Sequence, residues 1–279
     1  MRRIELTLRA DRSFPVPDSD GYQVYGALLD ALDTVDASVS QRVHDSPLGT
    51  IHNSGLRGSF AGSDRPHHKR VRANEPYGLS LGVADRDDEE LFETLVNAFV
   101  LDGDDIGLAE GTLRVESFES SNATHEELLE RASDVGSNAT LDVEFHTATC
   151  IEEAGEVTTM FPHRVSVFRS LLGKWNRTAP EELALDIGRE AIAGSVIEKP
   201  DPRAYDTHSV LVNRVEDDDG GTRPLFRQGF TGQCSYAFKN ASESVRNAVT
   251  ALGMFGEYSG VGSAVSRGCG HVTVEVNGT

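Results

Sequence analysis

Two histidines and one glycine-rich segment are the parts of this sequence best suited to chemistry. His44 stands at the end of a long helical pattern, and His52 follows in a predicted loop with Asn53 and Ser54. A helix C-terminus carries partial negative charge, which favours a protonated imidazole and suits a general acid. The same dipole makes histidine a common helix-capping residue. The residues alone leave both roles open for His44, and they leave His52 as either a partner base or a solvated loop residue.

The glycine-rich segment, residues 260–270, has the pattern G-x-G-x5-G-x-G. Glycines at this spacing allow positive φ angles and a close approach of the main chain to a ligand. Successive N–H groups in such a loop can form a concavity that binds phosphate oxygens. The predicted phosphate- or RNA-binding residues are Gly260, Gly262, Ser263, Ser266, Arg267, Gly268 and Gly270. The competing interpretation is a flexible hairpin that binds nothing.

Two well-known phosphate-binding loops do not fit this segment. A Walker loop needs Gly-Lys-Ser/Thr ahead of a helix, and a dinucleotide-binding fingerprint needs G-x-G-x-x-G between a strand and a helix. Residues 260–270 lie instead between the last predicted helix and the last predicted strand, and they have neither spacing. The pattern therefore favours neither of these nucleotide-binding classes.

The elements that position these residues follow a regular order in the first half of the chain. Residues 3–9 and 77–83 alternate apolar and polar side chains, as half-buried strands do. Apolar residues at intervals of three or four draw one helical stripe over residues 25–43, and Asp36 is the expected cap of a second helical piece within it. The other predicted elements are a short strand near 56–61, a helix with its inner face over 92–99, and a strand over 112–118.

The second half repeats the same rhythm after a polar stretch. Its predicted elements are strands at 141–145, 210–212, 226–238 and 272–276 and helices at 165–175 and 245–252. Each half therefore reads βαββαβ, the split-βαβ order. The sequence predicts an α+β fold of two tandem ferredoxin-like (RRM-like) domains. We expect an N-terminal domain at 1–120 that holds His44, a connector at 121–137, and a C-terminal domain at 138–279 with the glycine-rich loop.

Composition limits the class of protein. The chain has 279 residues, of which 38% are hydrophobic, and 45 acidic against 26 basic residues give a net charge of −19. An acidic chain with few lysines is typical of a salt-rich cytoplasm, where the Debye length shrinks toward ~3 Å at 1 M ionic strength. The sequence shows no apolar run of the ~20 residues that span a bilayer and no signal-peptide core. We therefore expect a cytoplasmic protein without a membrane segment.

Metal and disulfide chemistry have weak support in the sequence. The three cysteines, Cys150, Cys234 and Cys269, show no C-x-x-C spacing, so we expect reduced thiols. A basic run over residues 65–72 contains two histidines but lacks the cysteines and second ligand pair of a zinc site. We expect no metal ion. This run and the basic residues of the 164–177 helix, Arg164, Arg169, Lys174 and Arg177, are either phosphate-contacting surfaces or solvated charge.

Several motifs together resemble those of one protein family. They are the strand at 3–8, Val16-Pro17, Tyr22-Gln23-Val24-Tyr25, the helix that ends in Val43-His44, Met160-Phe161-Pro162 with the following helix, and the glycine loop running into Val272-Thr273-Val274-Glu275. In this order they resemble the CRISPR-associated endoribonucleases that cut the repeats of precursor CRISPR RNA, within the superfamily of repeat-associated RNA-binding proteins. The resemblance spans nearly the whole chain.

The resemblance implies a metal-independent reaction without a cofactor. The 2′-hydroxyl of the RNA attacks the adjacent phosphate, which leaves a 2′,3′-cyclic phosphate and a 5′-hydroxyl. Such a reaction needs a base, an acid and donors for the growing phosphoryl charge. His44 is the implied proton carrier, with His52 as second choice, and CRISPR repeat RNA is the implied partner. Other subunits of a type I interference complex are further implied partners.

Two alternatives to a nuclease stay open at this stage. A related, non-catalytic subunit could hold guide RNA in an interference complex, and such a scaffold would not require His44. A ferredoxin-like sensor of small molecules is a third class. The sequence also departs from the family's frequent Tyr and Lys, since residues 45–60 hold no Lys, and Leu29 stands where the Tyr is expected, one turn after Tyr25. A histidine acting with backbone donors, or with RNA that orients its own 2′-hydroxyl, fits this departure.

Overall fold

The computed structural model describes residues 1–46, 49–85, 88–103, 105–136, 138–154, 157–216 and 221–278. The chain divides into two units, and each is described here by itself. The first unit consists of residues 2–122 together with 266–268, and the second of Met1 with residues 123–265 and 269–279. The expected connector contains a packed helix, α4 (His125–Ser133), which belongs to the second unit and buries Leu128 and Ala132.

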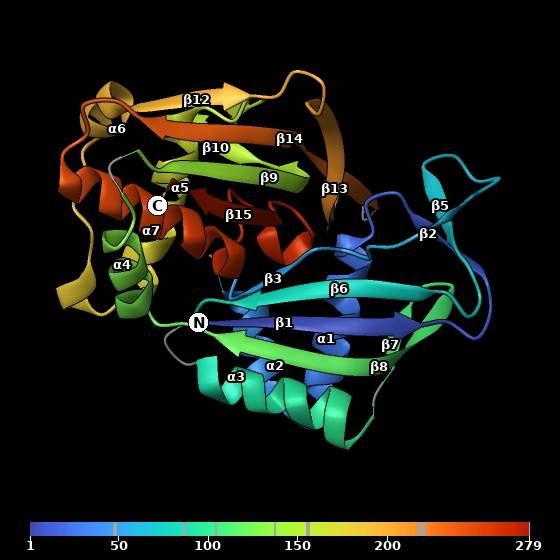
Figure 1. Ribbon diagram of the computed structural model, residues 1–279. Coiled ribbons are helices and arrows are strands. Elements are labelled where there is room, and N and C mark those ends of the chain that lie inside the picture. Colours follow the sequence, from blue (N-terminus) through green and yellow to red (C-terminus); the bar gives the residue numbers. More distant parts are fainter. Residues whose placement is uncertain are drawn as a thin grey trace. The chain divides into compact units, whose positions relative to one another are not determined.

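The first unit is built on an antiparallel sheet with the strand order β3-β6-β1-β8-β7 (Figure 1). Its strands are β1 (Arg2–Arg9), β3 (Ile51–Asn53), β6 (Pro76–Val83), β7 (Ile106–Leu108) and β8 (Gly111–Asn122). Successive side chains of a strand point to opposite faces. In β1 the side chains of Ile4, Leu6 and Leu8 are buried, whereas those of Arg3 and Glu5 are partly exposed. The alternation predicted for this strand is confirmed.

The helical stripe over residues 25–43 proves to be two helices, as the Asp36 cap predicts. They are α1 (Gly21–Val35) and α2 (Ala37–Asp45). The Asp36 carboxylate accepts hydrogen bonds from the N–H groups of Ser38 at 2.9 Å and Val39 at 3.4 Å. A side-chain cap of this kind stabilises a helix by about 1 kcal/mol. The unit also contains α3 (Asp88–Val96) and a π-helical turn, Asn97–Leu101.

One strand of the first unit lies earlier in the chain than predicted. The prediction near 56–61 is wrong, because β3 covers Ile51–Asn53 and pairs with β6, with Asn53 opposite Leu81. Gly55, with φ of 62°, turns the chain after this strand. The polar side chains of His52 and Asn53 made the strand look like a loop, yet both are buried.

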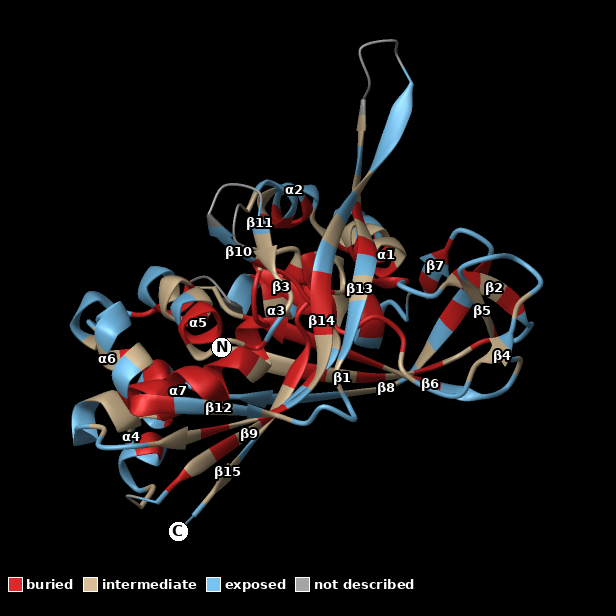
Figure 2. Cartoon of the chain, turned by 90° about the horizontal axis from the view of Figure 1, so that it is seen from above, coloured by how far each residue is buried: buried red, intermediate tan, exposed pale blue. Residues whose placement is uncertain are grey.

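The second unit has an antiparallel sheet with the strand order β12-β14-β9-β15, and β13 pairs with β14. Its strands are β9 (Thr140–Thr149), β12 (Val196–Pro200), β13 (Asp206–Glu216), β14 (Thr222–Phe238) and β15 (Val272–Asn277). Its helices besides α4 are α5 (Arg164–Thr178), α6 (Arg189–Ser195) and α7 (Glu243–Ser259), with a 3-10 turn at Glu181–Leu183. Another 3-10 turn, Val265–Arg267, begins in this unit and continues into the residues that belong to the first. Figure 2 shows α7 buried along most of its length.

Aromatic rings fill the core of the second unit. The ring centroids of Phe145 and Phe230, on adjacent strands, lie 5.1 Å apart, and Trp175 of α5 lies 5.4 Å from Phe255 of α7. His125 of α4 lies against Trp175 at 4.6 Å, with the two rings perpendicular. Aromatic pairs with this geometry stabilise a core beyond the burial of their area. They fix α4, α5 and α7 relative to one another.

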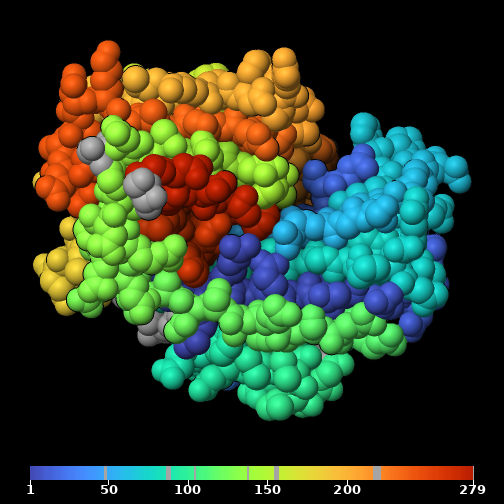
Figure 3. All heavy atoms as spheres, viewed as in Figure 1, coloured from blue at the N-terminus to red at the C-terminus, as the bar shows by residue number. Residues whose placement is uncertain are grey.

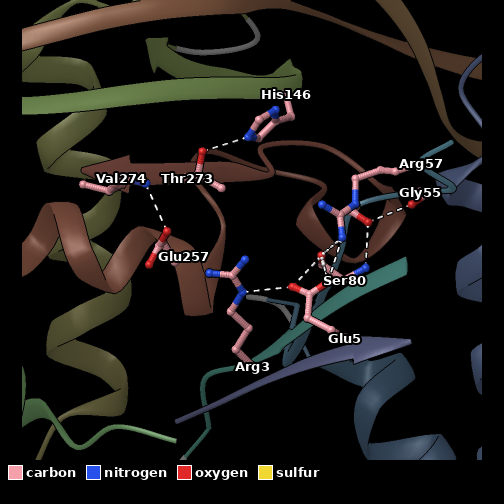
Figure 4. Close-up of polar contacts among 10 residues, drawn as sticks. Arg3, Glu5, Gly55, Arg57, Ser80, His146, Glu257, Thr273 and Val274 are labelled. Carbon is pink, nitrogen blue, oxygen red and sulfur yellow. Dashed lines mark hydrogen bonds and ion pairs between the residues drawn. The ribbon is translucent and has the colours of Figure 1, made fainter. Parts of the chain in front are cut away.

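The strand β15 ends the sheet of the second unit and is visible at its surface, in dark red, in Figure 3. Its Val274 N–H donates a hydrogen bond to Glu257 Oε1 of α7 at 3.0 Å (Figure 4). The helix therefore satisfies a main-chain donor of the edge strand.

Both units have the predicted order of elements. In the first, β1, α1, β3, β6, α3 and β8 follow the βαββαβ order, and in the second β9, α5, β12, β14, α7 and β15 do so. The strand predicted at 210–212 lies within β13, which pairs with β14 outside this order, and the third position is taken by β12, which the sequence pattern did not predict. The α+β class with two tandem ferredoxin-like domains is confirmed. Two small sheets accompany them, one of β2 (Phe14–Pro17), β5 (His68–Val71) and β4 (Ala61–Gly62), the other of β10 (Ile151–Ala154) and β11 (Val157–Thr159). Among the described helices, none has the length and apolar character needed to cross a membrane.

Candidate functional site

His44 lies in the last turn of α2, with its side chain exposed. The helix ends at the next residue, Asp45, so the sequence-based placement at a helix C-terminus is confirmed. No described residue forms a hydrogen bond or an ion pair with its imidazole. The ring can therefore accept or donate a proton to a bound molecule without first leaving a partner.

His52 has a different environment from the one that the sequence suggested. It lies in the middle of β3 and not in a loop, and only 1% of it is exposed. A proton carrier must reach its substrate, and a side chain closed off from solvent does not. The structure thus separates the two candidates: His44 is accessible and His52 is buried.

The tip of the glycine-rich loop, residues 266–268, belongs to the first unit. The buried Asn53 donates a hydrogen bond from Nδ2 to the Ser266 carbonyl oxygen at 2.5 Å and lies 3.3 Å from the Gly21 carbonyl oxygen. Its Oδ1 accepts from the Gly55 N–H at 2.8 Å. A Cβ atom on Gly21 would lie 2.3 Å from the Cα atom of Gly268. The loop tip therefore packs directly against Asn53 and Gly21.

Arg267, between those two loop residues, lies over an aromatic ring. Its guanidinium carbon is 5.2 Å from the centroid of the Tyr25 ring, which α1 supplies. Cations stack favourably on aromatic faces at this range. Burial raises the pKa of the Tyr25 hydroxyl, with Arg267 acting in the opposite direction and Asp45 in the same one. The pKa of Tyr25 therefore depends on Arg267 in the loop tip and on Asp45 at the end of α2, the residue after His44.

The rest of the loop is held by hydrogen bonds within the second unit. The Gly262 N–H donates to Ser170 Oγ at 3.0 Å, the Ser263 N–H to the Cys150 carbonyl at 2.7 Å, and the Gly270 N–H to the Ala148 carbonyl at 3.1 Å. These amides already have protein acceptors. They do not form the open phosphate-binding concavity that the sequence suggested.

The glycines are required for this internal packing. Gly262 and Gly270 have φ angles of 85° and 69°, in the left-handed region that glycine adopts readily. A Cβ at Gly270 would lie 1.9 Å from the Val261 carbonyl oxygen, and one at Gly262 would lie 2.4 Å from the Cys150 carbonyl oxygen. The expected positive φ angles are confirmed. The close approach that they permit is to the protein's own main chain.

The candidate RNA-binding residues differ in accessibility as a result. Ser263, Arg267 and Gly268 are partly exposed, whereas Gly260, Gly262, Ser266 and Gly270 are buried. The Nε atom of Arg267 is buried without a hydrogen-bond partner among the described residues. The partly exposed residues of the loop therefore provide only a few hydrogen-bond donors, and the buried residues hold them in place.

Two residues of each basic cluster are engaged within their own unit. In the first cluster, Lys69 Nζ lies 3.0 Å from Oδ2 of the buried Asp20, and Arg65 pairs with Glu110. In the second, Arg164 pairs with Glu198, and Lys174 is buried. The basic residues of α5 do not line one open face. No group of three or more described His, Cys, Asp or Glu residues could hold a metal ion.

A polar network covers the open face of the first sheet. Glu5 accepts from Arg3 Nε at 3.0 Å and from Arg57 Nη2 at 2.7 Å, and the Ser80 hydroxyl donates to its carboxylate (Figure 4). Two arginines share one carboxylate here. No local sequence pattern predicts this network, because Arg57 and Ser80 come from segments far from β1.

Comparison with known proteins agrees with this architecture. Residues 143–272 match the family model described as CRISPR-associated endoribonuclease Cas6. No curated protein matches the chain. Solved structures with the same fold include the product complexes of the Cas6 proteins TTHB231, of Thermus thermophilus (20% identity over 98% of each chain, TM-score 0.66), and TTHA0078 (21% identity over 99% of this chain and 100% of that one, TM-score 0.64).

A third structure extends the comparison to an archaeal source. The product of a Cas6-related gene from Pyrococcus furiosus shares 12% identity over 98% of each chain, with a TM-score of 0.63. At these identities the structures show a common fold, whereas the family model supplies a match in sequence. The resemblance to the CRISPR repeat-processing endoribonucleases is thus confirmed, by the Cas6 family signature in residues 143–272 and by the Cas6 fold over the whole chain.

Proposed function

We propose that this chain is a metal-independent endoribonuclease that cuts CRISPR repeats in precursor CRISPR RNA, with His44 as the proton carrier. The observation that carries the proposal is the exposed imidazole at the end of α2 in a chain with the Cas6 fold and family signature. The same structural unit contains Arg267 on the ring of Tyr25. His44 supplies the acid, and Arg267 supplies a donor for the growing phosphoryl charge.

The proposed step breaks one bond and forms one. The 2′-hydroxyl passes its proton to a solvent water molecule and its oxygen attacks the adjacent phosphorus, while the bond from phosphorus to the 5′-oxygen breaks. The imidazolium of His44 gives its proton to the departing 5′-oxygen. The products are a 2′,3′-cyclic phosphate and a 5′-hydroxyl. A positioned acid typically contributes 10²- to 10⁴-fold to the rate.

RNA contacts are assigned to the partly exposed part of the glycine-rich loop. Arg267, Ser263 and the main chain at Gly268 are the donors for phosphate oxygens, and the buried loop residues hold these donors in place. Related structures support an RNA-bound state, since those of TTHA0078 include a complex with a substrate mimic and a variant in which alanine replaces a histidine.

The test is cleavage of repeat RNA in EDTA at high salt, by the parent protein and by a His44→Ala variant. We expect the parent to release a fragment whose 2′,3′-cyclic phosphate resists phosphatase until it is opened by acid. The variant should bind RNA as the parent does and cut it 10²- to 10⁴-fold more slowly. His163→Ala is the matched control, because it removes a partly exposed histidine that pairs with Glu198.

Two results would overturn the proposal. RNA that stays intact with the parent protein removes the nuclease activity, and tight binding of that intact RNA would point to the guide-RNA-binding subunit. Equal cutting by the parent and His44→Ala removes the assignment of His44 alone.

A further inference from the structure

Lys174 is buried in α5, where only 8% of the residue is exposed. Its Nζ donates hydrogen bonds to the carbonyl oxygens of Ser259 at 3.0 Å and Gly260 at 2.9 Å. These are the carbonyls at the C-terminal end of α7, where no helical N–H group remains to pair with them. The lysine therefore fixes the point at which the glycine-rich loop begins.

The neighbouring turn of α5 contacts the next part of the loop. Ser170, four residues before Lys174, accepts the hydrogen bond from the Gly262 N–H. Residues four apart on a helix lie on the same face. One face of α5 thus holds three positions at the start of the loop: Ser259 and Gly260 through their carbonyls, and Gly262 through its amide.

The hydrogen-bonding capacity of a neutral amine matches this site. A neutral –NH₂ group has two hydrogens and an ammonium has three, and the structure provides two carbonyl acceptors. Burial, and to a smaller extent the nearby Arg177, lowers the pKa of Lys174 to about 7. An unpaired third N–H bond of a buried ammonium is costly, which agrees with this direction.

We propose that Lys174 is a positioning residue of the RNA-binding site: by holding the carbonyls of Ser259 and Gly260 it sets the conformation of the first part of the glycine-rich loop, which includes Ser263. The inference rests on the proposed function, since it assigns a role in RNA binding. It gives α5 a task that differs from the phosphate-contacting face expected from its basic residues. Lys174 touches the loop, and the RNA touches the loop and not Lys174.

The test uses Lys174→Met, which keeps the length of the side chain and removes its donors. Lys239→Met is the matched control, because it makes the same side-chain replacement at an exposed position. Single-turnover cleavage of repeat RNA at increasing protein concentration separates the half-saturating concentration from the maximal rate. Loss of two hydrogen bonds should raise the half-saturating concentration roughly 10-fold or more, with the maximal rate within about 2-fold of the parent's. Lys239→Met should leave both unchanged.

Hydrogen exchange of a peptide covering residues 259–268 provides a readout independent of RNA. Lys174→Met should speed exchange at Gly262 and Ser263, while Lys239→Met should not. Ser170→Ala, a smaller truncation, should produce the same pattern more weakly, and it serves if Lys174→Met fails to fold. Slow exchange in both variants would overturn the proposal. Fast exchange with unchanged RNA affinity would also overturn it.

The pH profile gives a second signature. Charged and titratable groups on α5 and on the elements packed against it include Arg164, Arg169 and Arg177 on α5 itself, His125 on α4, Arg189 and Glu190 on α6, Glu257 on α7, Glu152 and Glu153 on β10, and Glu198 and Lys199 on β12. Because the pKa of Lys174 is lowered in the clamped loop, the clamp should tighten as the pH rises above 7. RNA affinity of the parent, relative to that of Lys174→Met, should rise between pH 6 and pH 8.5. A pH-independent ratio would contradict the clamp.

The outcomes separate this inference from the proposed function. If the parent protein neither binds nor cuts repeat RNA, the proposed function fails, and the role assigned to Lys174 in RNA binding fails with it. If the parent cuts and Lys174→Met cuts with the same half-saturating concentration, the inference fails and the proposed function stands.

Discussion

Asn53 and Ser266 are 213 residues apart in the chain, yet the Asn53 amide donates a 2.5 Å hydrogen bond to the Ser266 carbonyl oxygen. The side-chain amide of Asn53 is fully buried. Its Nδ2 lies against the carbonyl oxygens of Ser266 and Gly21, and its Oδ1 accepts a hydrogen bond from the Gly55 N–H. Both ends of a side-chain amide are used here, and an aspartate could serve only one of them.

Asn53→Asp should therefore destabilise the protein. The new carboxylate would face the carbonyl oxygens of Ser266 and Gly21 without a donor, at a cost of about 2 to 4 kcal/mol in the free energy of unfolding. Urea unfolding at constant salt measures this change. Asn240→Asp adds the same charge at an exposed position and should change the free energy by less than about 0.5 kcal/mol. An equal loss of the free energy of unfolding in both variants would refute the packing of the loop tip against Asn53.

Gly270→Ala should be strongly destabilising because its Cβ would lie 1.9 Å from the Val261 carbonyl oxygen. We expect a loss of at least about 2 kcal/mol, from strain at positive φ and from displaced main chain. Gly26→Ala is the control, since nothing lies within 4 Å of a Cβ added in that part of α1. There alanine should stabilise by about 0.5 to 1 kcal/mol. Thermal unfolding of the two variants would show shifts of opposite sign, and a neutral Gly270→Ala would contradict the packing.

Arg267→Met should weaken RNA binding with little effect on folding. Removal of one phosphate contact should lower affinity roughly 10-fold and reduce the slope of log affinity against log salt by about 1. Arg267→Lys should recover the salt slope and only part of the affinity, because a lysine cannot stack its head group on Tyr25 as a planar guanidinium does. Filter binding across a salt series provides both quantities. An unchanged slope in Arg267→Met would remove this arginine from the RNA contact.

Acid should destabilise the second unit through His125. Burial lowers the pKa of this histidine from 6.5 to about 4, against Trp175 and Phe255. A folded-state pKa below the unfolded value means that stability is present above pH 6.5 and is lost as the pH falls toward 4. At pH 4.5 the loss should be about 2 to 3 kcal/mol.

The measurement for His125 compares the parent protein with His125→Leu, by urea unfolding at pH 7 and pH 4.5. Other carboxylates titrate in the same range, so the difference between the two proteins is the relevant quantity. The free energy of unfolding of His125→Leu, relative to that of the parent protein, should increase between pH 7 and pH 4.5. A difference that is constant with pH would show that His125 is not kept neutral by burial.

The three cysteines should be unreactive in the native protein. All are free and buried, and burial raises the pKa of Cys234 to about 11. The hydrogen bond with Cys269 lowers the pKa of Cys150, so that thiol is protected by its burial alone. The sulfur atoms of Cys150 and Cys269 lie 4.0 Å apart as a thiol pair. Because the thiolate is the reactive species, an aromatic disulfide reagent should label none of them quickly in native buffer and all three in denaturant. Rapid native labelling of any cysteine would contradict its burial.

Local patterns predicted the elements whose structure depends on their own residues. The alternation of β1 and the Asp36 cap are examples, because pleating and capping act within a few residues. The strand β3 was missed because His52 and Asn53 are polar and are buried only through contacts with distant segments. The glycine pattern indicated positive φ angles. It could not indicate that a protein carbonyl, such as that of Val261 or Cys150, occupies the space freed by the missing Cβ.

The candidate site residues show the same difference between what local sequence patterns predict and what depends on distant contacts. The position of His44 at a helix end could be read from the apolar stripe before it, and that placement is confirmed. Lys174 was grouped with surface arginines because a lysine on a helix is usually solvated. Its acceptors lie 85 and 86 residues further along the chain, so no local pattern reveals them.

The bond between Glu257 and the Val274 N–H has a consequence for how the molecules behave together. A bare strand border offers unpaired amides on which another polypeptide can build a continuous sheet. Here the Glu257 carboxylate of the adjacent helix accepts a hydrogen bond from one of those amides and places a negative charge beside the strand edge. A second molecule that approached this edge would find that donor already paired and would meet a like charge. The Val274 amide is therefore withdrawn from pairing with a strand of another molecule.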